Sequence, residues 1–167
     1  MNNIEIEKLI KISYEIRKDV INMLAKAGSG HLGGSLGMAD IFTVLYFNEL
    51  KHDPLQPDWE LRDRVIVSNG HIAPVWYATL SNAGYFSKKE LFSLRQFGSR
   101  LQGHPSRLSG LPGIESSSGS LGQGLSVAVG MALAAKFFQS NYRVFCLMGD
   151  GELQEGNVWE AFMSAGH

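Results

Sequence analysis

The sequence predicts an α/β fold in which a parallel sheet carries helices on both faces. Two short apolar runs, residues 64–68 and 142–148, are typical of strands, and segments with helical spacing surround them. Strands that alternate with helices favour a parallel sheet, because a parallel connection has to cross over the sheet. The run 142–148 is nearly continuous in apolar residues, which indicates a strand buried on both faces.

The composition is that of an ordinary globular domain. Hydrophobic residues make up 44% and charged residues 19% of the chain, which argues against a disordered protein or a coiled coil. The net charge of −1 provides no electrostatic footprint for nucleic acid or for an acidic membrane. The single cysteine, Cys146, excludes an intrachain disulfide and a cysteine metal cluster.

No segment has the pattern of a leader or of a membrane span. The first eleven residues mix charges with isoleucines, so they lack the apolar centre of a signal peptide. Residues 116–135 carry no charge, but they are apolar only from Leu125 onward. We therefore expect a buried helix there, entered through a loop, and a cytoplasmic protein without a membrane partner.

The N-terminal third predicts two helices joined by a glycine loop. Apolar residues recur at helical spacing as far as Leu24, and the helix should end at Gly28. Residues 28–37 contain five glycines and predict a loop with unusual backbone angles. Residues 38–50 predict a second, largely buried helix. The proline-containing residues 51–63, with His52 as a solvated side chain, predict a surface connection.

The next elements follow the first predicted strand. Helical spacing resumes through Trp76 and Ala83. Residues 87–94 predict a helix with a capping box, in which Ser87 is the N-cap and Glu90 the third helical residue.

The C-terminal third predicts a long loop over residues 102–124, a helix over 125–138 and a last helix from near Glu155. Both predicted strands are followed by glycine and a polar residue, in Asn69-Gly70-His71 and in Gly149-Asp150-Gly151. Ligands of parallel sheets bind outside the carboxyl ends of the strands. These two segments therefore locate a candidate site.

Asp150 is the first candidate for chemistry. A carboxylate at a strand end between two glycines suits Mg²⁺, which takes one or two protein carboxylates and completes its shell with phosphate and water. The competing interpretation is an ordinary turn, because Asp-Gly is a common turn dipeptide.

The loop 116–124 is the second candidate. Its glycines and the helix that follows could offer backbone N–H groups to an anion. Packing is the competing explanation, because small residues recur at helical spacing and imply a close backbone contact. These residues are Gly122, Ser126, Gly130 and Ala134.

Three histidines form the third candidate. His31, His71 and His104 each follow a glycine, so each lies in a loop that can approach a ligand closely. Imidazoles suit proton transfer and hydrogen bonds to sugar hydroxyls or phosphates. Their spacing does not fit a helical zinc pair. Glu155 is a fourth, weaker candidate, since an acid at a helix start is favoured by the helix dipole alone.

Taken together, these residues resemble the transketolase family over nearly the whole chain. The motifs that carry the resemblance are, in chain order, Gly28-Ser29-Gly30-His31-Leu32-Gly33, Leu36-Gly37-Met38, Arg62-Asp63-Arg64, Ser68-Asn69-Gly70-His71, Gly98-Ser99-Arg100, Gly103-His104-Pro105, Leu121-Gly122-Gln123-Gly124 and Gly149-Asp150-Gly151 with Gln154-Glu155-Gly156. The chain looks most like the N-terminal subunit of split transketolases, given the short connection before its second strand. The resemblance implies a thiamine diphosphate-binding fold and assigns residues 1–167 to the first half of the diphosphate-binding domain.

The resemblance also implies roles for the matched positions. Asp150 corresponds to the Mg²⁺ ligand and Gly151 to a diphosphate-binding backbone N–H. His71, Gly119, Ser120 and Leu121 correspond to further contacts of thiamine diphosphate. The implied catalytic residues are His31 and His104, which would hold the sugar oxygens and assist proton transfer, and Glu155; Glu160 matches an acid near the subunit interface.

The implied activity is transfer of a two-carbon ketol group from a ketose phosphate to an aldose phosphate, as in the pentose phosphate pathway. The family's second Mg²⁺ ligand, an asparagine, falls beyond His167, and the pyrimidine-binding domain is not part of this sequence. We therefore expect a truncated domain that is inactive alone. Its expected partners are a C-terminal transketolase subunit, or the missing domains, in a homodimer or heterotetramer.

Two alternatives stay open at this point. One is a part of 1-deoxy-D-xylulose 5-phosphate synthase, which shares the Gly-His-Leu-Gly loop; residues 111–114 and 154–156 favour transketolase. The other is a non-catalytic remnant of the fold.

Overall fold

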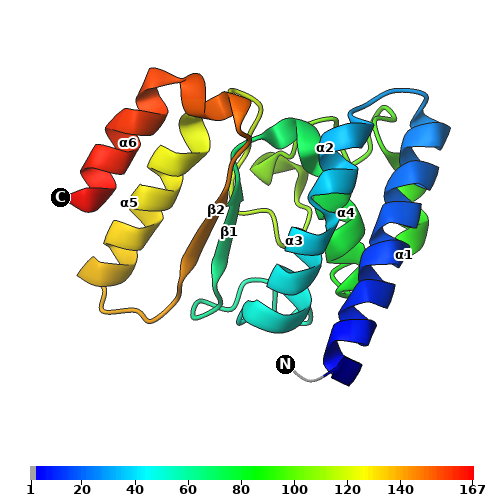
Figure 1. Ribbon diagram of the computed structural model, residues 1–167, viewed down its shortest axis with the longest axis horizontal. Helices are drawn as coiled ribbons and strands as arrows, with labels where there is room; N and C mark the ends of the chain where they lie inside the picture. The colour runs from blue at the N-terminus through cyan, green and yellow to red at the C-terminus, as the bar shows by residue number, and fades with distance from the viewer. Residues whose placement is uncertain (1–2) are drawn as a thin grey trace.

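The computed structural model describes residues 3–167 as three layers (Figure 1). Helices α5 and α6 cover one face of a two-stranded sheet, and α2, α3 and α4 cover the other, with α1 outermost. In chain order the elements are α1 (Asn3–Ala27), α2 (Leu32–Gly37), α3 (Ala39–Val44), β1 (Arg64–Val67), α4 (Ala73–Asn82), α5 (Gln123–Phe137), β2 (Val144–Leu147) and α6 (Gly156–Gly166). Within this part of the chain no helix combines the length and the apolar character that a membrane span needs.

The sheet confirms the predicted parallel pairing. Strand β1 pairs with β2 in a register that sets Arg64 opposite Val144 and Val67 opposite Leu147. The buried carboxylate of Asp63 fixes the starting ends of both strands. It accepts hydrogen bonds from the backbone N–H of Lys51 at 3.0 Å and of Arg143 at 2.8 Å, and it pairs with the Arg143 guanidinium at 2.7 Å.

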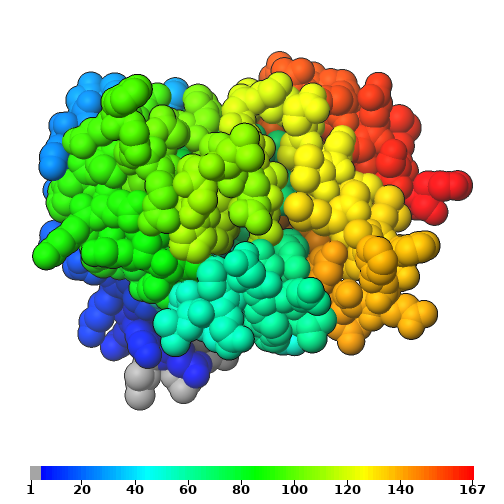
Figure 2. Space-filling view, turned by 180° about the vertical axis from the view of Figure 1, so that it is seen from behind, coloured from blue at the N-terminus to red at the C-terminus, as the bar shows by residue number. Residues whose placement is uncertain are grey.

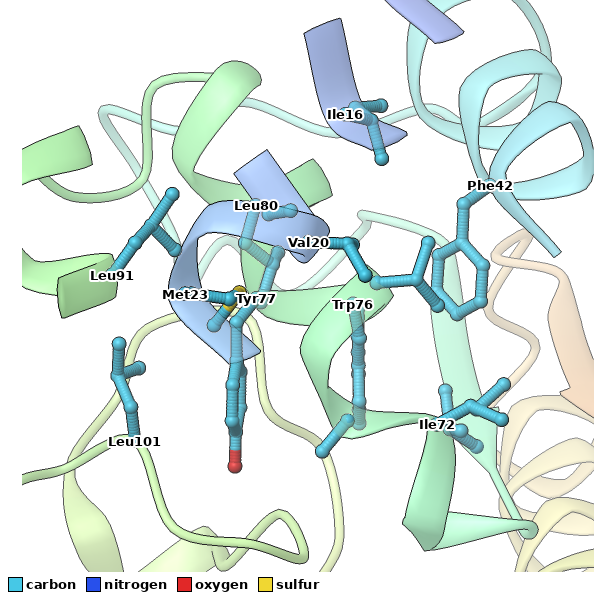
Figure 3. Packing of buried hydrophobic residues seen from close by; sticks show 14 of the residues in the cluster. Ile16, Val20, Met23, Phe42, Ile72, Trp76, Tyr77, Leu80, Leu91 and Leu101 are labelled. Carbon is cyan, nitrogen blue, oxygen red and sulfur yellow. The ribbon is translucent and has the colours of Figure 1, made fainter. Parts of the chain in front are cut away.

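The core lies between α4 and the N-terminal helices (Figure 3). Trp76 and Tyr77 of α4 are fully buried, and side chains of α1 and α3 pack against this cluster. The Trp76 indole donates a hydrogen bond of 2.7 Å to the Tyr46 hydroxyl. An aromatic side chain buried in this way keeps its polar group satisfied while it fills the core.

The glycine loop is shorter than the sequence predicts. Gly28 and Gly30 have φ angles of +66° and +134°, as expected of the loop, but Leu32–Gly37 forms the short helix α2. Packing explains the difference, because a Cβ on Gly34 would lie 3.0 Å from the Ile72 side chain. The close contact with the segment before α4 outweighs the poor helix propensity of glycine.

The predicted helix over residues 38–50 is present, but it is buried on one side only. It consists of α3 followed by a π-helical turn, Leu45–Glu49. Phe42 is fully buried, whereas Ile41 and Val44 are exposed. The expectation of a largely buried helix was therefore wrong for the face that carries these two residues.

The predicted helix over residues 87–94 is a 3₁₀ helix, Lys88–Ser93. Ser87 is its N-cap, but its hydroxyl accepts from the backbone N–H of Lys89, at 3.4 Å. Glu90 does not complete a capping box, because its carboxylate instead pairs with the Arg100 guanidinium through two bonds of 2.9 Å.

Two burial predictions were also wrong. His52 is half-buried rather than solvated, because one ring nitrogen lies 2.7 Å from the Tyr46 carbonyl oxygen and the other 3.0 Å from the Tyr85 hydroxyl. Strand β2 is half-buried rather than buried on both faces. An open hollow of about 410 Å³ lies beside it, and its lining includes Ile41 of α3 and the preceding Met38.

A buried ion pair ties the connection before β1 to the loop before α5. Arg62 and Glu115 lie 2.9 Å apart, and burial raises the pKa of the Glu115 carboxyl. Replacing Arg62→Met should lower the free energy of unfolding by about 3–5 kcal/mol, because it leaves a buried carboxylate without its main partner. Urea unfolding measures this change. The double variant Arg62→Met with Glu115→Leu should regain most of the lost free energy of unfolding. A double variant that remains as unstable as Arg62→Met would show that Arg62 does not stabilise the protein by compensating the Glu115 charge.

Candidate functional site

The carboxyl ends of β1 and β2 meet at one edge, as the sequence predicts. Ser68, which follows β1, donates its backbone N–H to the Leu147 carbonyl at 2.9 Å. The segments Asn69-Gly70-His71 and Gly149-Asp150-Gly151 therefore begin side by side. A Cβ on Gly149 would lie 3.6 Å from the Asn69 side chain, which is an ordinary contact distance.

Glu152 joins these strand ends to the start of α5, and the sequence analysis missed it. Its carboxylate is almost completely buried. It accepts hydrogen bonds from the Ser68 hydroxyl, from the backbone N–H of Gly122 at 2.6 Å and from that of Gly149 at 3.2 Å. An acid directly after Asp-Gly was the available signal, but its burial could not be inferred from one position.

Glycines allow the loop before α5 to lie directly on the strand ends. A Cβ on Gly70 would lie 2.9 Å from the Ser118 carbonyl carbon and 3.0 Å from the Gly119 nitrogen. A Cβ on Gly124 would lie 2.4 Å from the Ser68 Cβ. These positions require glycine because backbone or short side chains occupy the space.

The three histidines come together at this edge. The rings of His31 and His71 meet edge to face, with centroids 5.3 Å apart. The His104 ring lies against Gly119, where a Cβ would be 3.5 Å from it. Burial lowers the pKa of His104, and the nearby His31, Arg95 and His71 lower it further. Three separate loops thus contribute imidazoles to one place.

Arg95 is a second residue that the sequence analysis missed. Its φ angle of +61° is unusual for a residue with a side chain, and its backbone N–H bonds to the Leu101 carbonyl at 2.8 Å. The guanidinium lies across Gly103, where a Cβ would be 2.7 Å from it. Nothing in the local sequence marks this backbone conformation.

Asp150 lies at the end of β2 in a position to bind a cation. It is exposed, and its side chain forms no hydrogen bond or ion pair with any residue of 3–167. Gly151 begins a 3₁₀ turn, Gly151–Gln154, so the chain bends away directly after the carboxylate. Over the same residues no group of three or more histidine, cysteine, aspartate or glutamate side chains could hold a metal by itself. Asp150 therefore fits a metal that takes its other ligands from phosphate, water or further protein.

Residues Gly119, Ser120 and Leu121 are exposed just before α5. Gly119 and Gly122 have φ angles of +151° and +82°, so the segment is held in conformations that favour glycine. Its exposed backbone next to a helix start fits an anion or a cofactor phosphate. The Asn69 side-chain oxygen nearby is buried and lacks a partner within residues 3–167.

The two other predicted acids, Glu155 and Glu160, lie at the start of α6 and on α6. Glu155 is exposed at the N-cap of α6 without a capping bond, and Glu160 is exposed on α6 beside a groove against α5. Within the described residues, neither acid forms a hydrogen bond or an ion pair with the three histidines.

Gly70→Ala should displace the loop over the strand ends. The added Cβ would meet backbone atoms, which cannot rotate away, so we expect a loss of about 1–3 kcal/mol in the free energy of unfolding. Gly37→Ala is the matched control, because nothing lies within 4 Å of the added Cβ there. Urea unfolding of both variants tests the contact; equal stabilities would refute it.

The pKa of His104 should lie below the ordinary value of 6.5, so that its imidazole is neutral at pH 7. Arg95→Gln removes a positive charge that disfavours the imidazolium, so this pKa should rise. An NMR titration of the ring protons measures both values. Arg107→Gln is the control, because Arg107 is also exposed and lies in the short 3₁₀ helix Arg107–Ser109. An equal rise of the His104 pKa in both variants would contradict the role of Arg95.

Comparison with known proteins shows which family the chain is similar to. The family model for the transketolase thiamine diphosphate binding domain matches residues 9–167. One of the chains of the split apulose-4-phosphate transketolase of Phocaeicola vulgatus is 42% identical over 96% of this chain and 56% of its own length. Mouse transketolase is 39% identical over 97% of this chain and 26% of its own length. The chain thus spans about half of the split relative and a quarter of the full-length one.

Solved structures agree with the sequence comparison. Transketolase from Leishmania mexicana matches with a TM-score of 0.89 and 39% identity, over 95% of this chain and 25% of the other. Transketolase from Campylobacter jejuni matches with a TM-score of 0.87 and 38% identity, over 96% of this chain and 26% of the other. The chain belongs to the thiamine diphosphate-binding domain family of transketolases.

Proposed function

We propose that this chain forms part of the diphosphate-binding domain of a transketolase, which transfers a two-carbon ketol group from a ketose phosphate to an aldose phosphate. The observation that carries the proposal is the meeting of His31, His71 and His104 at the sheet edge where Asp150 follows β2, in a chain whose family match covers residues 9–167. The pentose phosphate pathway and a cytoplasmic location belong to the same proposal.

The residues present fit thiamine diphosphate with Mg²⁺. Asp150 would bind the metal, and the backbone N–H of Gly151 would bind the diphosphate. His71 would contact the diphosphate, while Gly119, Ser120 and Leu121 would lie along the cofactor. The bound cofactor supplies a carbon nucleophile that can carry a two-carbon unit. The free carboxylate of Asp150 and the unpaired Asn69 oxygen support a polar ligand at this edge.

His31 and His104 would act on the sugar. Both imidazoles are exposed, so each can reach a ligand oxygen. Because the pKa of His104 is lowered, its ring is neutral near pH 7 and can accept a proton from a hydroxyl group. Glu155 would assist near the cofactor, and Glu160 would lie toward the subunit interface. Their exposure on α6 is compatible with contacts to another chain.

Exposed apolar side chains on α5 and α6 support a protein partner. Figure 2 shows α5, in yellow and orange, on the outside of the molecule. The large exposed apolar side chains of α5, of its C-cap and of α6 are Val127, Leu133, Phe137, Phe138, Trp159, Phe162 and Met163. Large apolar side chains left exposed in this number are typical of protein–protein interfaces. We propose that a pyrimidine-binding domain, on a C-terminal subunit or further along the chain, completes the site in a homodimer or heterotetramer.

Small residues along α5 support the same partner. Gly122 is packed, since a Cβ there would lie 2.3 Å from the Asn157 side chain, but Gly130 has nothing within 4 Å. Gly122 is therefore packed against a side chain, whereas the predicted close contact is wrong at Gly130, within the described residues. At Gly130 the two helices leave a groove of about 340 Å³, which a side chain of a partner would fill.

The relatives narrow the substrate class to be tested. One belongs to an apulose-4-phosphate transketolase, and another, from Clostridium, belongs to a 6-deoxy-6-sulfo-D-fructose transketolase. Both names describe ketoses with an anionic group. We propose phosphorylated ketoses and aldoses for this chain.

Asp150→Asn tests the proposal, in the assembly purified through a tag on this chain. It should weaken Mg²⁺-dependent binding of thiamine diphosphate by more than the roughly 10- to 100-fold that outer-shell changes cause, because it removes the charged ligand. Isothermal titration measures the affinity. Asp58→Asn is the control, because Asp58 is also exposed and is distant from Asp150 in the sequence.

The same assembly should transfer a two-carbon unit between a ketose phosphate and an aldose phosphate. Condensation of pyruvate with an aldose phosphate, with release of carbon dioxide, would instead favour the deoxyxylulose phosphate synthase alternative. An assembly that binds no cofactor would favour the non-catalytic remnant.

A further inference from the structure

We propose that Glu152 is a positioning residue that holds the three cofactor-binding segments in their mutual arrangement. The proposal rests on the proposed function, since it concerns the site assigned there. Glu152 is not one of the residues expected to touch the cofactor. Its effect is exerted through residues that adjoin those contacts, by the side chain of Ser68 and the backbone N–H groups of Gly122 and Gly149.

The hydrogen bonds of Glu152 connect three separate parts of the chain. One carboxylate oxygen accepts from the Ser68 hydroxyl and from the backbone N–H of Gly122, at 2.6 Å. The other accepts from the backbone N–H of Gly149, at 3.2 Å. The Ser68 hydroxyl in turn accepts from the backbone N–H of Gly124, at 2.9 Å. Each oxygen and hydroxyl of the network is thus used.

Each bonded residue lies next to a proposed cofactor contact. Ser68 precedes the segment 69–71, which contains the diphosphate-binding histidine. Gly122 directly follows the segment 119–121. Gly149 directly precedes Asp150. Glu152 therefore fixes the relative positions of the metal ligand and of two loops that are far from it in sequence.

Only a carboxylate can serve in this place. All three groups that face Glu152 donate hydrogen bonds, and an ionised carboxylate accepts without donating. The side chain is 2% exposed, and it forms no ion pair with any residue of 3–167, so the hydrogen bonds alone compensate its burial. An amide of the same size would turn an N–H group toward at least one of the donors.

The opposite ends of the same strands provide a matched control. Asp63 is also a buried carboxylate that joins β1 to β2 by hydrogen bonds, to Lys51 and Arg143. It lies at the starting ends of the strands, away from the cofactor-binding segments. Glu152→Gln and Asp63→Asn therefore weaken comparable sets of hydrogen bonds. They differ in the end of the sheet at which these bonds are formed.

The experiment compares these two variants with the wild type in the tagged assembly. Both should lower the thermal midpoint. Only Glu152→Gln should raise the Kd for Mg²⁺ and thiamine diphosphate, by roughly 10- to 100-fold, as outer-shell changes at metal sites do. Hydrogen exchange of the cofactor-free protein should speed up at residues 119–124 and 149–151 in Glu152→Gln and stay unchanged there in Asp63→Asn.

Each outcome is decisive. Equal Kd values in both variants, or a Glu152→Gln variant that is destabilised with unchanged affinity, would overturn the positioning role and leave the proposed function intact. A wild-type assembly that binds no cofactor would overturn the proposed function itself. If Glu152→Gln does not fold, Ser68→Ala replaces it, because it removes one donor and keeps the carboxylate; an unchanged Kd there would also count against the role.

Discussion

The site depends on a pair of buried carboxylates that clamp the two strands at opposite ends. Asp63 holds the starting ends through Lys51 and Arg143, and Glu152 holds the carboxyl ends through Ser68 and the glycines of the neighbouring loops. Strands of four residues form few ladder hydrogen bonds. The hydrogen bonds of the two carboxylates therefore help to fix the register of the strands. At the carboxyl end they also fix the positions of the loops that follow.

Close packing of the backbone at glycines then links the positions of the strand ends to those of the three histidines. The loop before α5 lies on Gly70, and Gly119 lies against the His104 ring. His71 follows Gly70 and meets His31 from the loop before α2. A shift of the strand ends would therefore move all three imidazoles. The glycines at these positions allow close contact because they lack a Cβ. Glu152 instead fixes the positions of the groups that donate hydrogen bonds to its carboxylate.

The sequence was sufficient for the features that depend on local patterns. Apolar runs predicted both strands and their parallel pairing, and glycine beside a polar residue located Asp150 and His71. Features that depend on long-range contacts were missed. Glu152 is buried only because Ser68 and Gly122 arrive from elsewhere in the chain, and His52 is bonded only because Tyr85 folds back onto it. The motifs, the fold and the match over residues 9–167 agree on the family.

Helix α5 is apolar on more sides than the other described residues cover. A helix that is apolar on all sides is expected in the interior of a protein. Only Gly124, Leu125, Ala128 and Ala135 of α5 are buried, whereas Leu133 and Phe137 face outward. The same helix begins directly after the proposed cofactor contacts at Gly119, Ser120 and Leu121. In the assembly proposed above, a partner that covers the outer face of α5 would therefore also contact the helix whose N-terminus adjoins this segment.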